Sequence, residues 1–207
     1  MNEKKLMVSS AAAVNEDTLA RVDSYLKEFD LAPRDMLHVR LLVEETLGML
    51  KAMTGQYSAS LWLLTQDNCC RLHVVATSDM DINKKKELLS VSNSGKNAYA
   101  RGFMSKIGDM IENGILNYEN VVNLQQKYGM GYVDVASMGG NPSDIMFTWS
   151  LDQYKKSLGK EDRNSEKATQ AWDELEKSIV ANIAKNITVG VRKDHVEMVI
   201  DKDLLGE

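Results

Sequence analysis

A glycine-containing segment with basic residues is the part of the sequence best suited to holding an anion. Gly95 and Gly102 enclose Lys96 and Arg101, and a helical pattern resumes at Phe103. Backbone N–H groups at a helix N-terminus, together with the helix dipole, bind phosphates and other anions. The segment is therefore a candidate anion-binding loop, and the alternative interpretation is an ordinary surface loop.

Carboxylates are the second kind of candidate. Glu44 and Glu45 are adjacent within a segment of helical spacing. Taken by itself, the pair is best interpreted as the solvated flank of an amphipathic helix. Asp79 and Asp81 follow a predicted strand, in a position typical of a turn.

Cysteine, histidine and charge usage argue against several classes of function. The two cysteines are adjacent and the three histidines are scattered, which gives little support to a zinc site or to Cys/His catalysis. A net charge of -5 argues against general nucleic-acid binding. The sequence contains neither a signal-peptide pattern nor an apolar run of about 18 residues. We therefore expect a cytoplasmic protein with reduced thiols that binds neither nucleic acid nor membrane.

The elements that would position these residues follow from hydrophobic spacing. We expect a strand at 5–9, helices at 15–29 and 33–54, a hairpin of strands 58–64 and 71–77, a polar connection, helical patterns at 103–111 and 118–128, and a hairpin of strands 132–137 and 145–151. This order predicts an α+β fold, a two-layer sandwich with helices on one face of a mixed, mostly antiparallel sheet.

A polar segment at 159–165 predicts a domain boundary between residues 1–158 and 159–207. Beyond it an amphipathic helix and a final hairpin, 187–191 with 196–200, form a C-terminal extension. An added hairpin must pair its edges, so this one could extend the sheet or contact a second copy in a homodimer.

From residue 1 to about residue 155 the chain resembles the GHKL superfamily of histidine-kinase-like ATPases, especially the bacterial anti-sigma-factor serine kinases. The likeness rests on the strand at 6–8 with its following helix, the helix motif at 42–47, the strand at 71–76 followed by Asp79 and Asp81, and the hairpin spanning 133–151. The resemblance implies a Bergerat-type ATPase-like sandwich in which 133–151 is the closing hairpin. The lid is either the whole of 82–117, or shorter, with 103–111 as the helix after the phosphate loop.

The resemblance also implies a helix carboxylate that acts as general base and an asparagine one turn later that holds Mg²⁺. The base position falls on Glu45 and the magnesium position on Met49. In a register shifted by one residue, Glu44 is the base, Gly48 takes the asparagine position and Lys51 a basic position. Neither register supplies an oxygen ligand, and a thioether is a poor ligand for a hard cation.

The adenine-binding loop is altered in the same way. The family aspartate falls on Ser78, with Met80 and Ile82 where glycines let the backbone approach the base. A slip of one residue would give Asp79 the aspartate role.

The resemblance with altered motifs predicts a degenerate, non-catalytic regulatory module that binds a protein partner, either a sigma-factor-like or an anti-anti-sigma-like regulator, with no cofactor expected. The alternative is a divergent ATP-dependent serine kinase or a histidine-kinase-like ATPase that binds ATP and Mg²⁺. It would use Glu45 as base, Asp79 to read adenine, and Gly95, Lys96 and Gly102 at the phosphates. A third alternative is an apolar ligand in a pocket lined by Met49, Met53 and Met80.

Overall fold

A computed structural model describes residues 5–9, 16–54, 57–66, 68–77, 107, 111, 131–132, 147–160, 166–192 and 195–205. The strands are β1 Leu6–Ser9, β2 Ser58–Gln66, β3 Cys69–Thr77, β4 Gly131–Tyr132, β5 Phe147–Ser150, β6 Asn186–Arg192 and β7 His195–Asp203. The helices are α1 Glu16–Leu26, α2 Pro33–Thr54, α6 Leu151–Leu158, α7 Glu166–Lys177 and α8 Ile179–Ile183.

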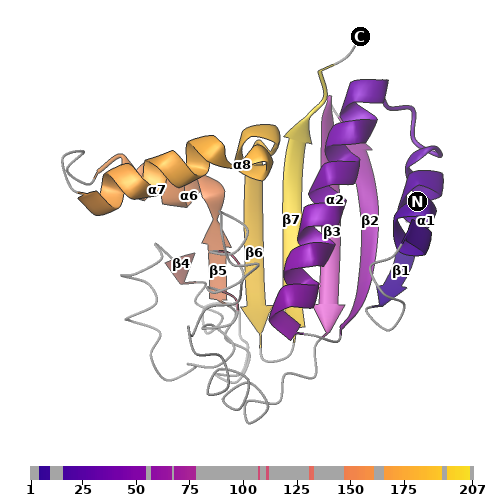
Figure 1. Ribbon diagram of the computed structural model, residues 1–207, viewed down its shortest axis with the longest axis horizontal. Coiled ribbons are helices and arrows are strands. Elements are labelled where there is room, and N and C mark those ends of the chain that lie inside the picture. Colours follow the sequence, from indigo (N-terminus) through magenta and orange to yellow (C-terminus); the bar gives the residue numbers. More distant parts are fainter. Residues whose placement is uncertain are drawn as a thin grey trace.

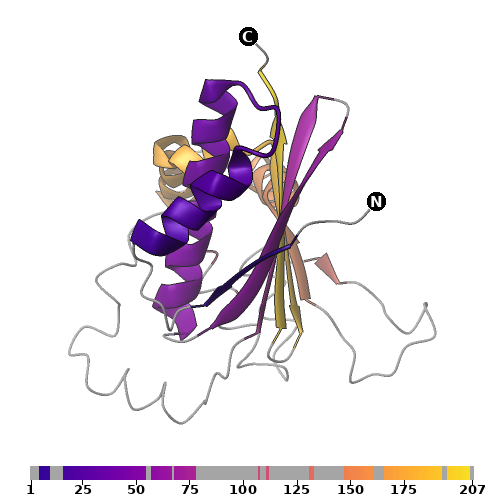
Figure 2. The same ribbon diagram turned by 90° about the vertical axis from the view of Figure 1, so that its right-hand side faces the viewer.

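The described strands form one sheet of seven strands in the order β1-β2-β3-β7-β6-β5-β4, and every neighbouring pair is antiparallel. Figure 2 shows α1 and α2 on one side of this sheet, and Figure 1 shows α2 running in front of its central strands. The predicted α+β class is therefore confirmed. The described pairs are all antiparallel, in keeping with the prediction of a sheet that is mostly antiparallel.

The alternation of side chains along the strands explains the two layers. In β3 and β7, and in β2 as far as Leu63, every second residue is buried, and the residues between them are half-buried or exposed. Leu61, Leu72 and Met198 face the helices. Alternation of this kind is expected of an antiparallel sheet that is covered on one face only.

Helix α2 fills the centre of the helical layer. Pro33 suits the first helical turn because its ring fixes φ and it has no N–H that would need a partner there. Val39, Val43 and Leu50 are at most 1% exposed and pack on the sheet. The structure confirms the predicted bounds of this helix. It also confirms the predicted hairpin, which is formed by β2 and β3.

The N-terminus of α2 is joined to the end of β7 by a buried ion pair. The Lys202 ammonium group donates to the Asp35 carboxylate and to the carbonyl oxygen of Asp203, the latter at 2.7 Å. The second Asp35 oxygen accepts from the backbone N–H of Leu205 at 3.0 Å. Because both charged groups are satisfied, the pair holds the helix and the last strand together without an uncompensated buried charge.

The C-terminal hairpin lies in the middle of the sheet, not at its edge. β7 pairs with β3 along the whole length of both strands, and β6 pairs with β5. The hairpin beside β3 is therefore β6–β7, whereas the region predicted as the closing hairpin contributes β5, which lies next to the edge strand β4. A single hydrophobic cluster contains residues from both sides of the predicted boundary at residue 159.

Helix α6 is absent from the sequence prediction, which continued a strand to Leu151. Its N-cap is Ser150, whose side-chain oxygen accepts from the backbone N–H of Gln153 at 3.2 Å. Leu151 and Leu158 on this helix are buried. The predicted helix at 118–128 lies outside the described residues, and Ile107 and Ile111 are the described residues of the predicted 103–111 helix; both are helical and buried.

Candidate functional site

The predicted catalytic carboxylate lies on the solvent side of α2. Glu45 is exposed, and its neighbour Glu44 is half-buried. Arg40 lies 3.5 Å from Glu44 and 2.7 Å from Asp23 of α1, so Glu44 takes part in an ion-pair network between the two helices. Of the two candidate bases, Glu45 is therefore the more exposed.

The residues that follow these carboxylates determine what the face of α2 can bind. Met49 is 6% exposed and belongs to the hydrophobic core. Gly48 is exposed, and a Cβ atom built on it would meet no heavy atom within 4 Å. Lys51, the basic position of the shifted register, is exposed. Neither magnesium position therefore offers an oxygen atom to a cation, because a glycine has no side chain and a buried thioether is a soft ligand.

Most of the remaining predicted site residues lie outside the described residues, namely Asp79, Met80, Gly95, Lys96 and Gly102. Met53 lies in α2, but its side chain is not described. The structure therefore describes only the helical half of the predicted nucleotide site.

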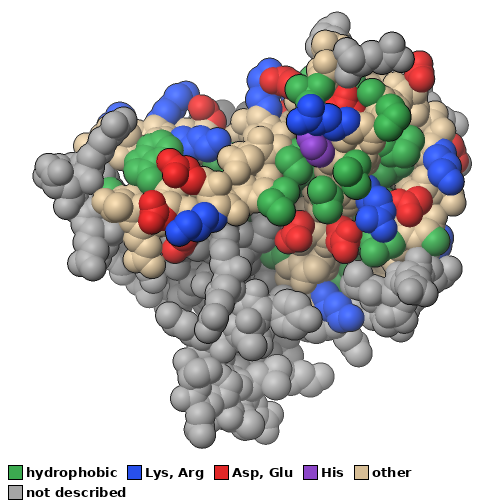
Figure 3. All heavy atoms as spheres, turned by 45° about the horizontal axis from the view of Figure 1, so that its top comes forward, with side chains coloured by type: hydrophobic (Ala, Val, Ile, Leu, Met, Phe, Trp, Pro, Cys, Tyr) green, Lys and Arg blue, Asp and Glu red, His purple; other side chains and the backbone are tan. Residues whose placement is uncertain are grey.

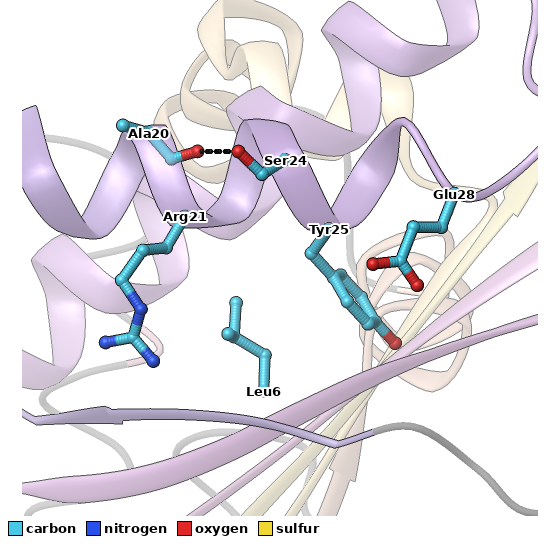
Figure 4. A pocket seen from close by; sticks show the side chains of 6 residues that line it. All are labelled: Leu6, Ala20, Arg21, Ser24, Tyr25 and Glu28. Atoms are coloured by element: carbon cyan, nitrogen blue, oxygen red, sulfur yellow. Dashed lines mark hydrogen bonds between the residues drawn. The ribbon is translucent and has the colours of Figure 1, made fainter.

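A shallow hollow of about 320 Å³ lies between α1 and β1, lined by Leu6, Ala20, Arg21, Ser24, Tyr25 and Glu28 (Figure 4). Its polar groups take part in internal hydrogen bonds. Arg21 donates to the carbonyl oxygen of Met7 at 3.0 Å, and Ser24 donates to that of Ala20 at 2.9 Å. The Tyr25 hydroxyl accepts from the backbone N–H of Leu63 at 3.1 Å, on a part of β2 that extends past its pairing with β1. The bonds of Arg21 and Tyr25 therefore join α1 to β1 and β2 at the edge of the sheet.

Polar groups gather where α2 begins. Burial alone would raise the pKa of the Asp35 carboxyl, but the hydrogen bonds from Lys202 and Leu205 outweigh it and lower that pKa. Burial lowers the pKa of His38, and the positive charges of Lys202 and Arg34 lower it further. Burial raises the pKa of the Cys70 thiol to about 12, so this thiol stays protonated and unreactive.

The sheet face opposite the helices carries an aromatic pair that the sequence analysis did not single out. The rings of Trp62 and His73 stack with centroids 4.8 Å apart, and the Lys5 ammonium group lies 4.4 Å from the centre of the Trp62 ring. Trp62 and His73 are directly opposite each other on β2 and β3. The signal for this pair was available in the predicted hairpin, since both residues lie on its less buried face.

Comparisons with protein-family models, curated proteins and solved structures found no match. In the part of the chain that the structure describes, no cluster of three or more His, Cys, Asp or Glu residues is arranged to hold a metal ion. No described helix combines the length and the apolar character needed to cross a bilayer.

Proposed function

We propose that this chain is a degenerate histidine-kinase-like ATPase domain that serves as a non-catalytic regulatory module in the cytoplasm. Its partner would be a protein regulator, sigma-factor-like or anti-anti-sigma-like. The proposal rests on the GHKL likeness of the sequence, together with the residues that α2 has at the expected magnesium position. The observation that carries it is the burial of Met49 beside a glycine at position 48, which leaves the expected magnesium position without an oxygen ligand.

The chemistry of phosphoryl transfer explains why this loss matters. Catalysis in nucleotide-dependent phosphotransfer consists largely of positioning and of charge neutralisation by Mg²⁺ between the phosphates. A lone carboxylate such as Glu45 could still orient water, but without a metal ligand it repels the phosphates. A face of this kind is better suited to contacting a protein than to turning over ATP.

Phosphate release from ATP by the purified full chain in the presence of Mg²⁺ tests the catalytic part of the proposal. We expect release no faster than in a blank without protein, both for the wild type and for Glu45→Ala. Turnover by the wild type that Glu45→Ala abolishes would establish the alternative, a divergent ATP-dependent serine kinase or ATPase in which Glu45 is the general base.

A further inference from the structure

The outward face of α2 carries an apolar centre with opposite charges at its two ends. Three residues spaced seven apart lie along this face, namely Arg34, Leu41 and Gly48. The same face carries Leu37 one helical turn before Leu41 and Glu45 one turn after it. Leu37 is 52% exposed although it is a large apolar side chain in a helix interior. Arg34 and Glu45 are also exposed, and neither forms an ion pair with another described residue.

Figure 3 shows hydrophobic side chains gathered on this side of the molecule, with charged side chains of both signs around them. On the neighbouring α8, which packs beside α2, Ile179 is 64% exposed. Exposed apolar side chains that cluster and are rimmed by charges mark interaction surfaces more often than isolated ones do.

The arrangement of the charges indicates which partner fits. If two α2 helices pack antiparallel about a two-fold axis passing between residues 39 and 40, Arg34 of each copy faces Glu45 of the other. The same axis places His38 opposite Leu41, so apolar and half-buried side chains meet in the middle. A partner of uniform charge would complement one end of this stripe and repel the other. The face is therefore complementary to itself.

We propose that α2 is the contact of a two-fold symmetric homodimer, formed by the stripe Arg34, Leu37, Leu41 and Glu45 of two copies of this chain. The inference goes beyond the proposed function and requires no nucleotide. The helix contact leaves the edge of the sheet at β1 unused, and it covers Glu45, the predicted catalytic position. Because one helical face buries a modest area, we expect the dimer to be in equilibrium with monomer, with a dissociation constant in the micromolar range or above.

Sedimentation equilibrium of the full chain, from about 1 µM to about 1 mM, measures the association constant directly. We expect a monomer–dimer equilibrium that weakens at least about tenfold in Arg34→Glu and in Glu45→Arg, because each reversal creates two like-charge contacts. The double variant R34E/E45R exchanges the two charges and should recover wild-type affinity to within about threefold. Glu176→Arg, an exposed reversal on α7, is the matched control and should leave association unchanged.

Circular dichroism checks that each variant keeps the fold, as expected for substitutions of exposed side chains. A wild type that stays monomeric over the whole range would overturn the proposal. Two further results would overturn it: an association constant that the single charge reversals leave unchanged, or one that the double variant fails to restore. In either case the dimer contact would lie elsewhere, for example at the sheet edge.

Discussion

Asp35 and Lys202 are separated by 167 residues in sequence, yet their charged groups meet in the core with side chains 2% and 3% exposed. The sequence analysis did not pair them, because a lysine and an aspartate in distant amphipathic segments each look like solvated residues. Burial of both groups is a consequence of β7 lying beneath the start of α2, which is a fact of topology and not of local pattern.

Removing one member of this pair should strongly destabilise the protein. Asp35→Ala leaves the Lys202 ammonium group buried with only a carbonyl acceptor, at an expected cost of about 3–5 kcal/mol in the free energy of unfolding. The double variant Asp35→Leu/Lys202→Met should lose less than Asp35→Ala, because it buries no charge. Urea unfolding measures both, with Lys156→Ala in the exposed Lys156–Asp152 pair as the control. Equal losses in Asp35→Ala and Lys156→Ala would contradict this account of the buried pair.

His38 should make stability depend on pH. Its pKa in the folded protein is lowered from 6.5 by burial and by Lys202 and Arg34, against a smaller opposing effect of Asp35. The unfolded chain therefore binds the proton more readily, so the stability contribution is complete above pH 6.5 and is lost as pH falls through and below that value.

Urea unfolding between about pH 7.5 and pH 5 tests this dependence. The wild type should lose more stability across the interval than His38→Gln, whose side chain does not titrate. Parallel curves for wild type and His38→Gln would show that His38 does not carry the effect.

At the scale of elements, local sequence patterns correctly predicted the elements that are long or that are joined by a tight turn. The proline at the start of α2 and its helical spacing predicted both of its ends, and bulky alternating residues predicted β2 and β3. Helix α6 was missed because it begins directly after β5, with Ser150 both ending the strand and capping the helix. A serine cap inside an apolar run was hidden by the strand pattern around it.

The cap of α6 should have a measurable effect. Ser150→Ala removes the side-chain acceptor for the N–H of Gln153 and should lower the free energy of unfolding by about 1 kcal/mol. Ser58→Ala, on the exposed start of β2, is the matched control and should change it by less than about 0.5 kcal/mol. Equal effects of the two substitutions in urea unfolding would argue against the capping role.

At the scale of the whole molecule, the order of the strands is what the sequence could not provide. Hairpins are local, so β2–β3 and β6–β7 were both recognised as pairs. The pairing of β3 with β7 joins residues more than 110 positions apart and leaves no local pattern. The segment predicted as a C-terminal extension therefore supplies two strands of the sheet interior, β6 and β7. Of the candidate nucleotide site, the described residues include the part on α2.

A chain ending at residue 158 tests this arrangement. It would leave β3 without its neighbour β7 and would remove the Lys202 partner of the buried Asp35. We expect it to show no cooperative urea transition and no native near-ultraviolet circular dichroism, whereas the full chain shows both. Cooperative unfolding of the shorter chain would instead support an independent domain at residues 1–158.

Binding of ATP tests the central claim most directly, because the claim is that α2 presents a nucleotide face without a magnesium ligand. Isothermal titration of the full chain with ATP and Mg²⁺ should give no binding heat at protein concentrations up to about 100 µM, whether or not Mg²⁺ is present. Magnesium-dependent binding with a micromolar dissociation constant would contradict the claim and show that the chain still holds nucleotide.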